Sequence, residues 1–249
     1  MHDRCGISGE LCKGTTRAEV DGYKVEPIRD LRSGRTVGCE LLYCGAPLQT
    51  TGQWREWYQH IPEILASLQP VSGWVAVNID TWQILDNVML DLLQCLCSDN
   101  LVIEWTESSL GQPRGADILE AAHRLVDLRE HSGTRISIDD AGAGIDAIHR
   151  MSLARPDFVK FDGTLFHRAR GNRHTRTLIQ GLVSTVHAIG AQTIIEWIET
   201  SEDYDLAQSL NAMLGQGFLF CREDRANDNG NRDRQSFPDR LDNHRKILY

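Results

Sequence analysis

The sequence has no apolar run long enough to span a bilayer, and its beginning lacks the apolar core of a secretory signal peptide. Cysteines are few and scattered, without paired CxxC spacing, at Cys5, Cys12, Cys39, Cys44, Cys95, Cys97 and Cys221. An odd, scattered set favours reduced thiols over a disulfide framework or a CxxC-type zinc site. We therefore expect a cytoplasmic protein with no membrane span.

Positive charge is also in short supply. Lys and Arg together number 26 against 35 Asp and Glu, which gives a formal net charge of -9. This balance argues against a broad basic surface for polymeric nucleic acid or an anionic membrane. It leaves room for a small anionic ligand, because bound divalent cations can reverse the local field.

The chain contains eight segments with strand-like patterns, most of them separated by stretches with helical spacing. These segments are 23–28, 36–42, 74–79, 101–108, 135–144, 157–162, 192–200 and 215–220. Alternation of this kind predicts parallel βαβ units, and eight of them predict an α/β fold of the TIM type, a (β/α)8 barrel. The first two segments are joined by a short turn through Ser33 and Gly34, so we expect them to be antiparallel.

Composition divides the chain into three parts. Residues 1–19 are polar with little periodicity and are interpreted as a leader. Residues 20–222 carry the alternating pattern and form the predicted barrel domain. Residues 223–249 are charged and polar until the last few positions, and are interpreted as a tail.

Polar side chains recur at the ends of the predicted strands: Asn78, Glu104, Asp139, Asp140, Lys160, Asp162 and Glu196. Taken singly, each residue could simply cap a loop or helix. In a barrel, however, the carboxyl ends of the strands form one rim, where active sites of this architecture are built. Carboxylates facing one another across a rim would repel unless cations lay between them, so the pattern predicts a metal site.

Asp139 and Asp140 pose a geometric problem, because adjacent side chains on a strand point to opposite faces. They converge only if the strand ends there and the backbone turns. Gly142 and Gly144 follow at once and permit such a turn.

Oxygen ligands without His or Cys at the strand ends favour two Mg²⁺ or Mn²⁺ ions over Zn²⁺. Such a pair, about 3.5–4 Å apart, suits hydrolysis of a phosphate ester. Lys160 would then hold or deprotonate the attacking water, with a pKa lowered by the neighbouring cations. Glu40 lies inside a predicted strand, where it must either face solvent or have a cationic partner.

Seven short motifs, in order, resemble the EAL-domain family of cyclic di-GMP phosphodiesterases. They are ELL at 40–42, VNI at 77–79, IEWTES at 103–108, IDDAGAG at 138–144, VKFD at 159–162, IEWIET at 195–200 and GQGFLF at 215–220. The resemblance covers roughly residues 23–222. It implies a barrel with an antiparallel first strand, a divalent metal pair, and hydrolysis of the bacterial second messenger cyclic di-GMP to linear pGpG, which lowers its cellular level.

The resemblance also implies roles for individual residues. The implied metal ligands are Glu40, Asn78, Glu104, Asp139, Asp140 and Glu196. Lys160 would activate the water, and Glu40, Asp140 and Glu196 would share in catalysis. Leu42, Gln216 and Asp162 would contact the substrate, while Glu107 and Glu199 would support the loop after Asp140 and the site. A homodimer through the apolar stretch Ile145 to Leu153 is implied as well, although those residues could equally face the barrel.

Several positions depart from the family pattern. Cys44 stands where the family usually has a phosphate-gripping Arg, and Glu26 stands where Gln is common. Ala141 and Ala143 replace Phe and Thr, and Trp197 replaces Gly. Loss of the Arg could cost about 1.5–3 kcal/mol, or roughly ten- to a hundredfold in binding.

Three functions therefore remain open. The first is a metal-dependent cyclic di-GMP phosphodiesterase, favoured by the full set of acids with Lys160. The second is a non-catalytic EAL-like module that binds cyclic di-GMP or a partner protein and acts as a regulator. The third is a barrel hydrolase for a different phosphodiester.

Overall fold

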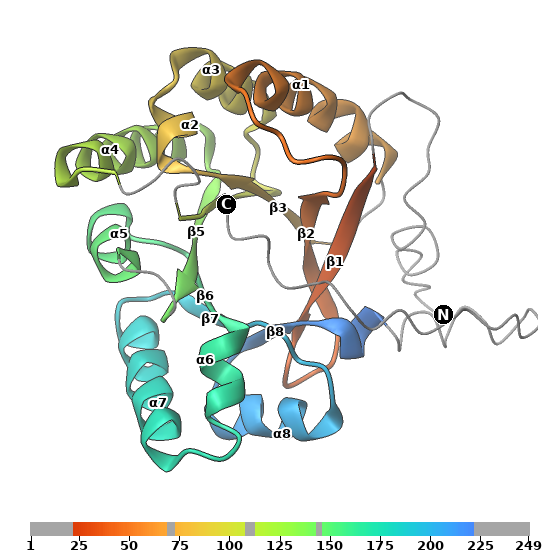
Figure 1. Ribbon diagram of the computed structural model, residues 1–249, viewed down its shortest axis with the longest axis vertical. Helices are drawn as coiled ribbons and strands as arrows, with labels where there is room; N and C mark the ends of the chain where they lie inside the picture. The colour runs from red at the N-terminus through yellow and green to blue at the C-terminus, as the bar shows by residue number, and fades with distance from the viewer. Residues whose placement is uncertain (1–21, 69–72, 108–112, 143–145, 222–249) are drawn as a thin grey trace, which may run out of the picture.

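The computed structural model describes residues 22–68, 73–107, 113–142 and 146–221. Over these ranges eight strands close into a barrel, with helices packed around its outside (Figure 1). The expected leader 1–19 and tail 223–249 lie outside the described residues. No helix within the described ranges is both long enough and apolar enough to cross a membrane.

The elements follow the predicted alternation. The strands are β1 (Tyr23–Asp30), β2 (Thr36–Tyr43), β3 (Trp74–Ile79), β4 (Leu101–Trp105), β5 (Arg135–Ala141), β6 (Phe158–Phe161), β7 (Gln192–Ile195) and β8 (Leu214–Gln216). The helices are α1 (Thr51–Ser67), α2 (Thr81–Leu85), α3 (Asn87–Leu96), α4 (Gly115–Ser132), α5 (Ala147–Ala154), α6 (Gly163–Arg168), α7 (Arg173–Ala188) and α8 (Ser201–Ser209).

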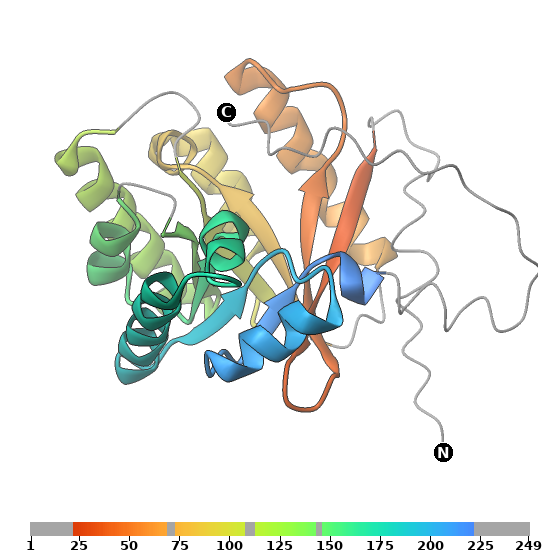
Figure 2. The same cartoon turned by 60° about the horizontal axis from the view of Figure 1, so that its bottom comes forward.

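Strand β1 is antiparallel to both of its neighbours, β2 and β8, while the other neighbouring strands pair in parallel. The predicted TIM-type barrel with an antiparallel first strand is confirmed. The β1–β2 turn lies at the end of the barrel opposite the carboxyl ends of the parallel strands, at the bottom of Figure 2.

The last predicted strand, 215–220, is wrong in its second half. Strand β8 ends at Gln216, and residues 218–221 form a helical turn. The Phe220 amide donates to the Gly217 carbonyl at 3.2 Å, and the Phe220 side chain is buried against the Arg29 guanidinium, 5.0 Å from the ring centroid. Apolar residues are therefore buried here by a turn that folds back over β1.

Side chains inside the barrel change from apolar to polar along its axis. Toward the β1–β2 turn, the barrel interior is filled by a buried apolar cluster: Ile28, Trp74, Ala76, Val102, Phe158, Ile194 and Leu214. Polar residues follow two positions further along the same strands, as in Ala76 to Asn78 or Val102 to Glu104. Because alternate residues of a strand share one face, this periodicity places the polar side chains inside the mouth of the barrel.

A second, larger core lies between the strands and the helices. The outward-facing strand residues, such as Val77 and Ile103, pack there with helix residues such as Tyr58 and Ile61 of α1. The stretch from Ile145 to Leu153, which the family resemblance implies for dimerisation, is partly buried and partly exposed. Ala147 and Arg150 are buried, whereas Ile148 is 71% exposed, and Ile145 lies outside the described residues.

Candidate active site

Five buried ionisable residues meet inside the mouth of the barrel, and we call them the acid–lysine cluster: Glu40, Glu104, Asp139, Lys160 and Glu196. Lys160 Nζ lies 2.6 Å from Glu104, 3.0 Å from Glu40, 3.0 Å from Glu196 and 3.7 Å from Asp139. The Lys160 side chain is only 1% exposed. One ammonium group thus stands among four carboxylates that are far apart along the chain.

Two amides hold Glu40 in place. Asn78 Nδ2 donates to one oxygen of Glu40 at 2.7 Å, and Gln216 Nε2 donates to the other at 2.6 Å. The buried Tyr58 hydroxyl in turn donates to the Asn78 carbonyl, which fixes the end of β3. On the sequence alone, Glu40 must either face solvent or have a cationic partner, and in the structure that partner is Lys160.

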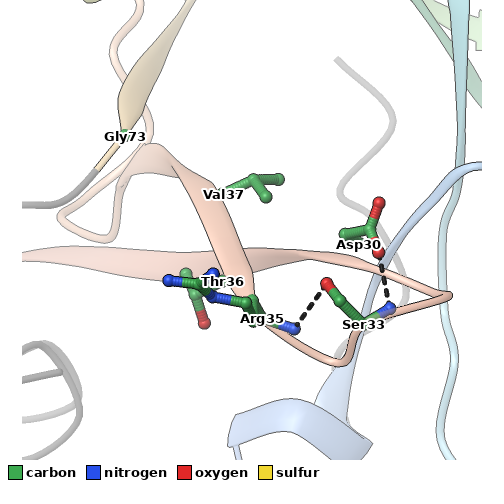
Figure 3. A pocket seen from close by; sticks show the side chains of 6 residues that line it. All are labelled: Asp30, Ser33, Arg35, Thr36, Val37 and Gly73. Atoms are coloured by element: carbon green, nitrogen blue, oxygen red, sulfur yellow. Dashed lines mark hydrogen bonds between the residues drawn. The ribbon is translucent and has the colours of Figure 1, made fainter. Parts of the chain in front are cut away.

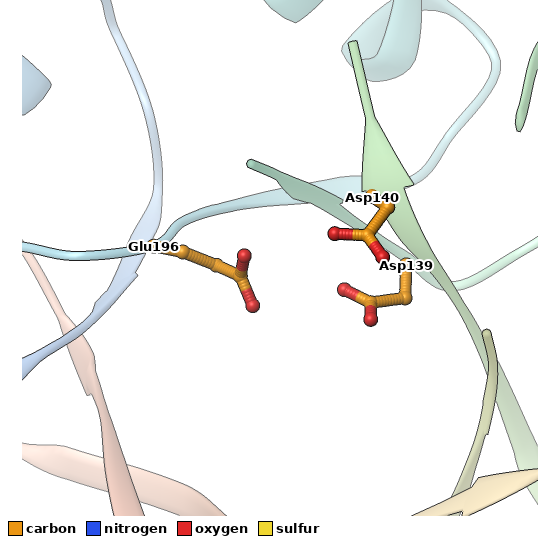
Figure 4. A group of neighbouring side chains, drawn as sticks. All are labelled: Asp139, Asp140 and Glu196. Carbon is orange, nitrogen blue, oxygen red and sulfur yellow. The ribbon is translucent and has the colours of Figure 1, made fainter. Parts of the chain in front are cut away.

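Asp139 and Asp140 converge because the backbone turns at Asp140 itself. Asp140 has a left-handed φ of +58°, and the pairing of β5 with β6 shifts register between Ile138 and Ala141. The expected turn therefore exists, but it begins at Asp140, two residues before Gly142. Figure 4 shows the carboxylates of Asp139, Asp140 and Glu196 directed toward one another, and one oxygen of each lies within 4.8 Å of the others.

Burial and charge set the protonation of the cluster. Burial alone would raise the pKa of Glu40, but the charge of Lys160 and the hydrogen bonds from the two amides outweigh this effect. Together they lower the pKa of Glu40 to about 2. Burial, together with the charges of Glu40 and Asp139, raises the pKa of Glu104 well above its ordinary value despite Lys160. Burial would lower the pKa of Lys160, but the surrounding carboxylates raise it well above its ordinary value. Without cations, the lowered lysine pKa expected from the sequence does not arise.

The residues present fit a divalent cation. Asp139 Oδ1 is buried and accepts no hydrogen bond within the described part of the chain. It belongs to the group of three converging carboxylates, an arrangement that a hard cation stabilises. The donors are oxygens from carboxylates and an amide, which suits Mg²⁺ or Mn²⁺. The geometry therefore accommodates the predicted type of metal.

Arg150 is a supporting residue that sequence analysis missed. Its guanidinium is fully buried and donates to the Trp105 carbonyl at the end of β4 and, at 3.1 Å, to the Asp139 carbonyl in β5. Asp146 anchors it at 2.8 Å. Arg150 thereby ties together the backbone of two site strands. The sequence offers no clear signal for this role, because the stretch around Arg150 also contains the polar residues His149 and Ser152.

The other predicted site residues lie outside the cluster. Asp162 caps α6, where its Oδ1 accepts the Thr164 and Leu165 amides at 2.9 and 3.1 Å. Leu42 lies in β2, two residues beyond Glu40, and is half-buried. Glu107 is exposed, and Glu199 is half-buried beside the start of α8. Asp162 thus has a structural role as a helix cap, while its predicted substrate contact stays a prediction.

Trp197 occupies its unusual position by adopting the conformation that glycine favours. Its φ is +59°, in the left-handed region that is rare for a bulky residue. The indole covers Gly163 so closely that a Cβ there would lie 2.1 Å from the ring. His167 contacts the same ring edge-on, with centroids 5.8 Å apart. The backbone beyond Glu196 therefore keeps a left-handed turn despite the large side chain.

The hollow drawn in Figure 3 lies away from the acid–lysine cluster. It is lined by Asp30, Ser33, Arg35, Thr36, Val37 and Gly73, beside the β1–β2 turn. Its Asp30 carboxylate already accepts the Ser33 and Arg32 amides, at 2.6 and 3.1 Å. Since this end is opposite the polar mouth, we assign it no part in the site.

Several curated proteins are similar in sequence. The oxygen sensor protein DosP of Escherichia coli is 23% identical over 172 residues, which cover 68% of this chain and 20% of DosP. The cyclic di-GMP phosphodiesterase RocR of Pseudomonas aeruginosa is 23% identical over 160 residues, which cover 62% of this chain and 39% of RocR. The chain thus spans well under half the length of these relatives.

Solved structures share the fold. BlrP1 of Klebsiella pneumoniae, in a complex with manganese and cyclic di-GMP, superposes with a TM-score of 0.70 at 20% identity, over 82% of this chain and 56% of that one. An EAL domain protein from Listeria monocytogenes superposes with a TM-score of 0.67 at 16% identity, over 84% of this chain and 92% of that one.

The family model described as "EAL domain" matches residues 56–223. The match begins within α1, so it leaves out β1 and β2 with Glu40. It covers the strand ends that carry the remaining members of the acid–lysine cluster. The chain belongs to the EAL domain family.

Proposed function

We propose that this protein hydrolyses cyclic di-GMP to linear pGpG with the help of two divalent cations, Mg²⁺ or Mn²⁺. The observation that carries the proposal is the acid–lysine cluster, which gathers four carboxylates and one lysine at the carboxyl ends of the barrel strands. Relatives named as cyclic di-GMP phosphodiesterases support the choice of substrate.

Six residues would hold the cations: Glu40, Asn78, Glu104, Asp139, Asp140 and Glu196. When bound, the cations would supply positive charge for the phosphate oxygens and lower the pKa of a water molecule. Burial and the neighbouring carboxylates raise the pKa of Glu104, so a bound cation would compete with protonation of this carboxyl. In hydrolysis the water oxygen bonds to phosphorus, one P–O ester bond breaks, and a proton passes to the leaving sugar oxygen.

Lys160 has the position for orienting the attacking water. Its ammonium lies between Glu104 and Glu196, and its N–H groups would donate to the water once cations take over the charge of the carboxylates. Leu42, Gln216 and Asp162 stay proposed substrate contacts, and Glu107 and Glu199 proposed supports of the loop and the site.

Cys44 points to weak substrate binding rather than a lost chemical step. It is exposed, and a thiol provides no charged fork for a phosphate. Partial burial of the sulfur atom raises the pKa of the Cys44 thiol despite nearby Lys24, so the thiol is neutral near pH 7. The catalytic carboxylates are separate from this position, so a higher KM is expected with the hydrolytic machinery intact.

The test is hydrolysis of cyclic di-GMP in the presence of Mn²⁺, with pGpG measured by chromatography. Glu40→Ala should reduce product to background, because it removes a proposed ligand and a Lys160 partner. Glu130→Ala is the matched control, since this acid is exposed on α4. Equal background product from the wild type and Glu40→Ala would reject the proposal.

Binding separates the remaining candidates. Wild-type protein that binds cyclic di-GMP in Ca²⁺ but produces no pGpG in Mn²⁺ would be a non-catalytic regulator. Turnover of other cyclic dinucleotides in preference to cyclic di-GMP would identify a different phosphodiester substrate. We also propose that residues 20–222 form one folding unit and that α5, with its exposed Ile148, contributes to a homodimer.

A further inference from the structure

A second lysine lies on the inner wall of the barrel, nearer to the mouth than the acid–lysine cluster. Lys24 and Glu26 alternate along β1, so they share the face on which Glu26 contacts Gln216. In the β1–β2 register Glu26 is opposite Glu40, and Lys24 is opposite Leu42. Two residues of a strand span about 7 Å. Lys24 therefore stands one layer above the carboxylates.

A chain of polar contacts connects Lys24 to the cluster. Lys24 Nζ lies 2.6 Å from Glu26 Oε1, and Gln216 Nε2 donates to Glu26 Oε2 at 3.1 Å. The same Gln216 nitrogen donates to Glu40 at 2.6 Å. The lysine is thus held in register with the site.

Exposure distinguishes Lys24 from Lys160. The Lys24 side chain is 44% exposed, and among the described residues its ammonium pairs with one carboxylate, whereas Lys160 is buried among four. An ammonium has three donors, so Lys24 keeps capacity for a ligand oxygen. Cys44 adjoins the start of β1, where its amide donates to the Gly22 carbonyl at 2.9 Å, and adds no charge there.

We propose, on the basis of the function proposed above, that Lys24 is a substrate-binding residue that donates to a phosphate of the cyclic dinucleotide and sets its affinity. Glu26 holds the ammonium over the mouth in the free protein. On binding, the phosphate shares the ammonium with Glu26. Lys24 then supplies, from the inner face of β1, the positive charge that Cys44 cannot provide at the end of β2.

The competing explanation is that Lys24 only neutralises Glu26, whose negative charge would otherwise repel the ligand. The two explanations differ in a Glu26→Gln background. A lysine that contacts phosphate is still required there, whereas a lysine that only neutralises Glu26 is not. A double-mutant cycle therefore separates them.

The experiment measures the dissociation constant for cyclic di-GMP in Ca²⁺ by calorimetry and the KM in Mn²⁺. Lys24→Met is expected to weaken binding roughly tenfold, with kcat nearly unchanged. Glu26→Gln is expected to tighten binding, and adding Lys24→Met to it should again weaken binding by about tenfold. Lys24→Arg, which keeps a cationic donor, should bind within a few-fold of the wild type, and thermal unfolding checks that each variant folds.

Unchanged affinity in Lys24→Met overturns the inference while the wild type still binds or hydrolyses the nucleotide, which leaves the proposed function standing. Loss of the Lys24→Met effect in the Glu26→Gln background also overturns it, because Lys24 then acts only through Glu26. Wild-type protein that neither binds nor hydrolyses cyclic di-GMP rejects both proposals together.

Discussion

Replacing Lys160 by Met removes the cation that the four carboxylates of the acid–lysine cluster share. The side chain is 1% exposed, so water cannot replace the lost charge. Breaking a buried ion pair by removing one partner typically costs about 3–5 kcal/mol. For a chain of this size that free energy corresponds to a fall in melting temperature of roughly 6–20 °C.

The loss of unfolding free energy in Lys160→Met should depend on whether a divalent cation is present. In EDTA, Lys160→Met should show the full deficit in urea or thermal unfolding. Mn²⁺ should then stabilise the variant more than the wild type, because the cation compensates carboxylates that Lys160 no longer neutralises. A ligand at a hundred times its dissociation constant contributes about 2.7 kcal/mol, enough to restore much of the deficit. Protonation also removes the uncompensated charge, so the deficit should shrink as pH falls.

Lys24→Met is the matched control for stability. It removes the same type of side chain from a 44% exposed ion pair, which is worth at most about 1 kcal/mol. If Lys160→Met in EDTA is as stable as this control, or if Mn²⁺ stabilises the variant no more than the wild type, the electrostatic reasoning is refuted.

Three further outcomes are expected. The pKa of Glu40 falls from 4.5 to about 2 on folding, so its charge stabilises the metal-free protein by up to about 3 kcal/mol above pH 4.5. This stabilisation is lost as pH falls through about 2. Urea unfolding should therefore show Glu40→Gln to be less stable than the wild type near pH 6, with little difference near pH 2. Cys44→Arg should tighten cyclic di-GMP binding in Ca²⁺ by about ten- to a hundredfold in calorimetry, and unchanged affinity would show that this wall does not contact phosphate. Gly38→Ala places a Cβ 2.4 Å from the Trp74 ring and should cost about 1–3 kcal/mol in thermal unfolding, with Mn²⁺ affinity unchanged.

The barrel and its polar mouth were predictable because both depend on simple periods. Alternation of strand and helix patterns indicates parallel units, and alternation within strands places Asn78 and Glu104 on the inner face beyond Ala76 and Val102. A prediction based on period two holds as long as the backbone stays extended. At Asp162 the chain enters α6 and the carboxylate caps the helix, a role that the strand period does not encode.

Other features depend on local backbone conformation or on contacts between distant residues, and periodicity does not encode these. The left-handed Asp140 and the register shift beside it were inferred only as an unspecified turn. Arg150 reads in the sequence as a surface residue of a helix, yet it is buried against the carbonyls of two strands. Only the folded chain reveals that Lys160 joins four carboxylates.

The proposed hydrolysis depends on divalent cations held by the carboxylates of this mouth. The anomalous difference map of a crystal soaked in Mn²⁺ would locate such cations. We expect two peaks about 3.5–4 Å apart among Glu104, Asp139, Asp140 and Glu196, with Lys160 moved away from at least one carboxylate. A map without peaks there, and with Lys160 still beside the same four carboxylates, would refute the presence of a metal site.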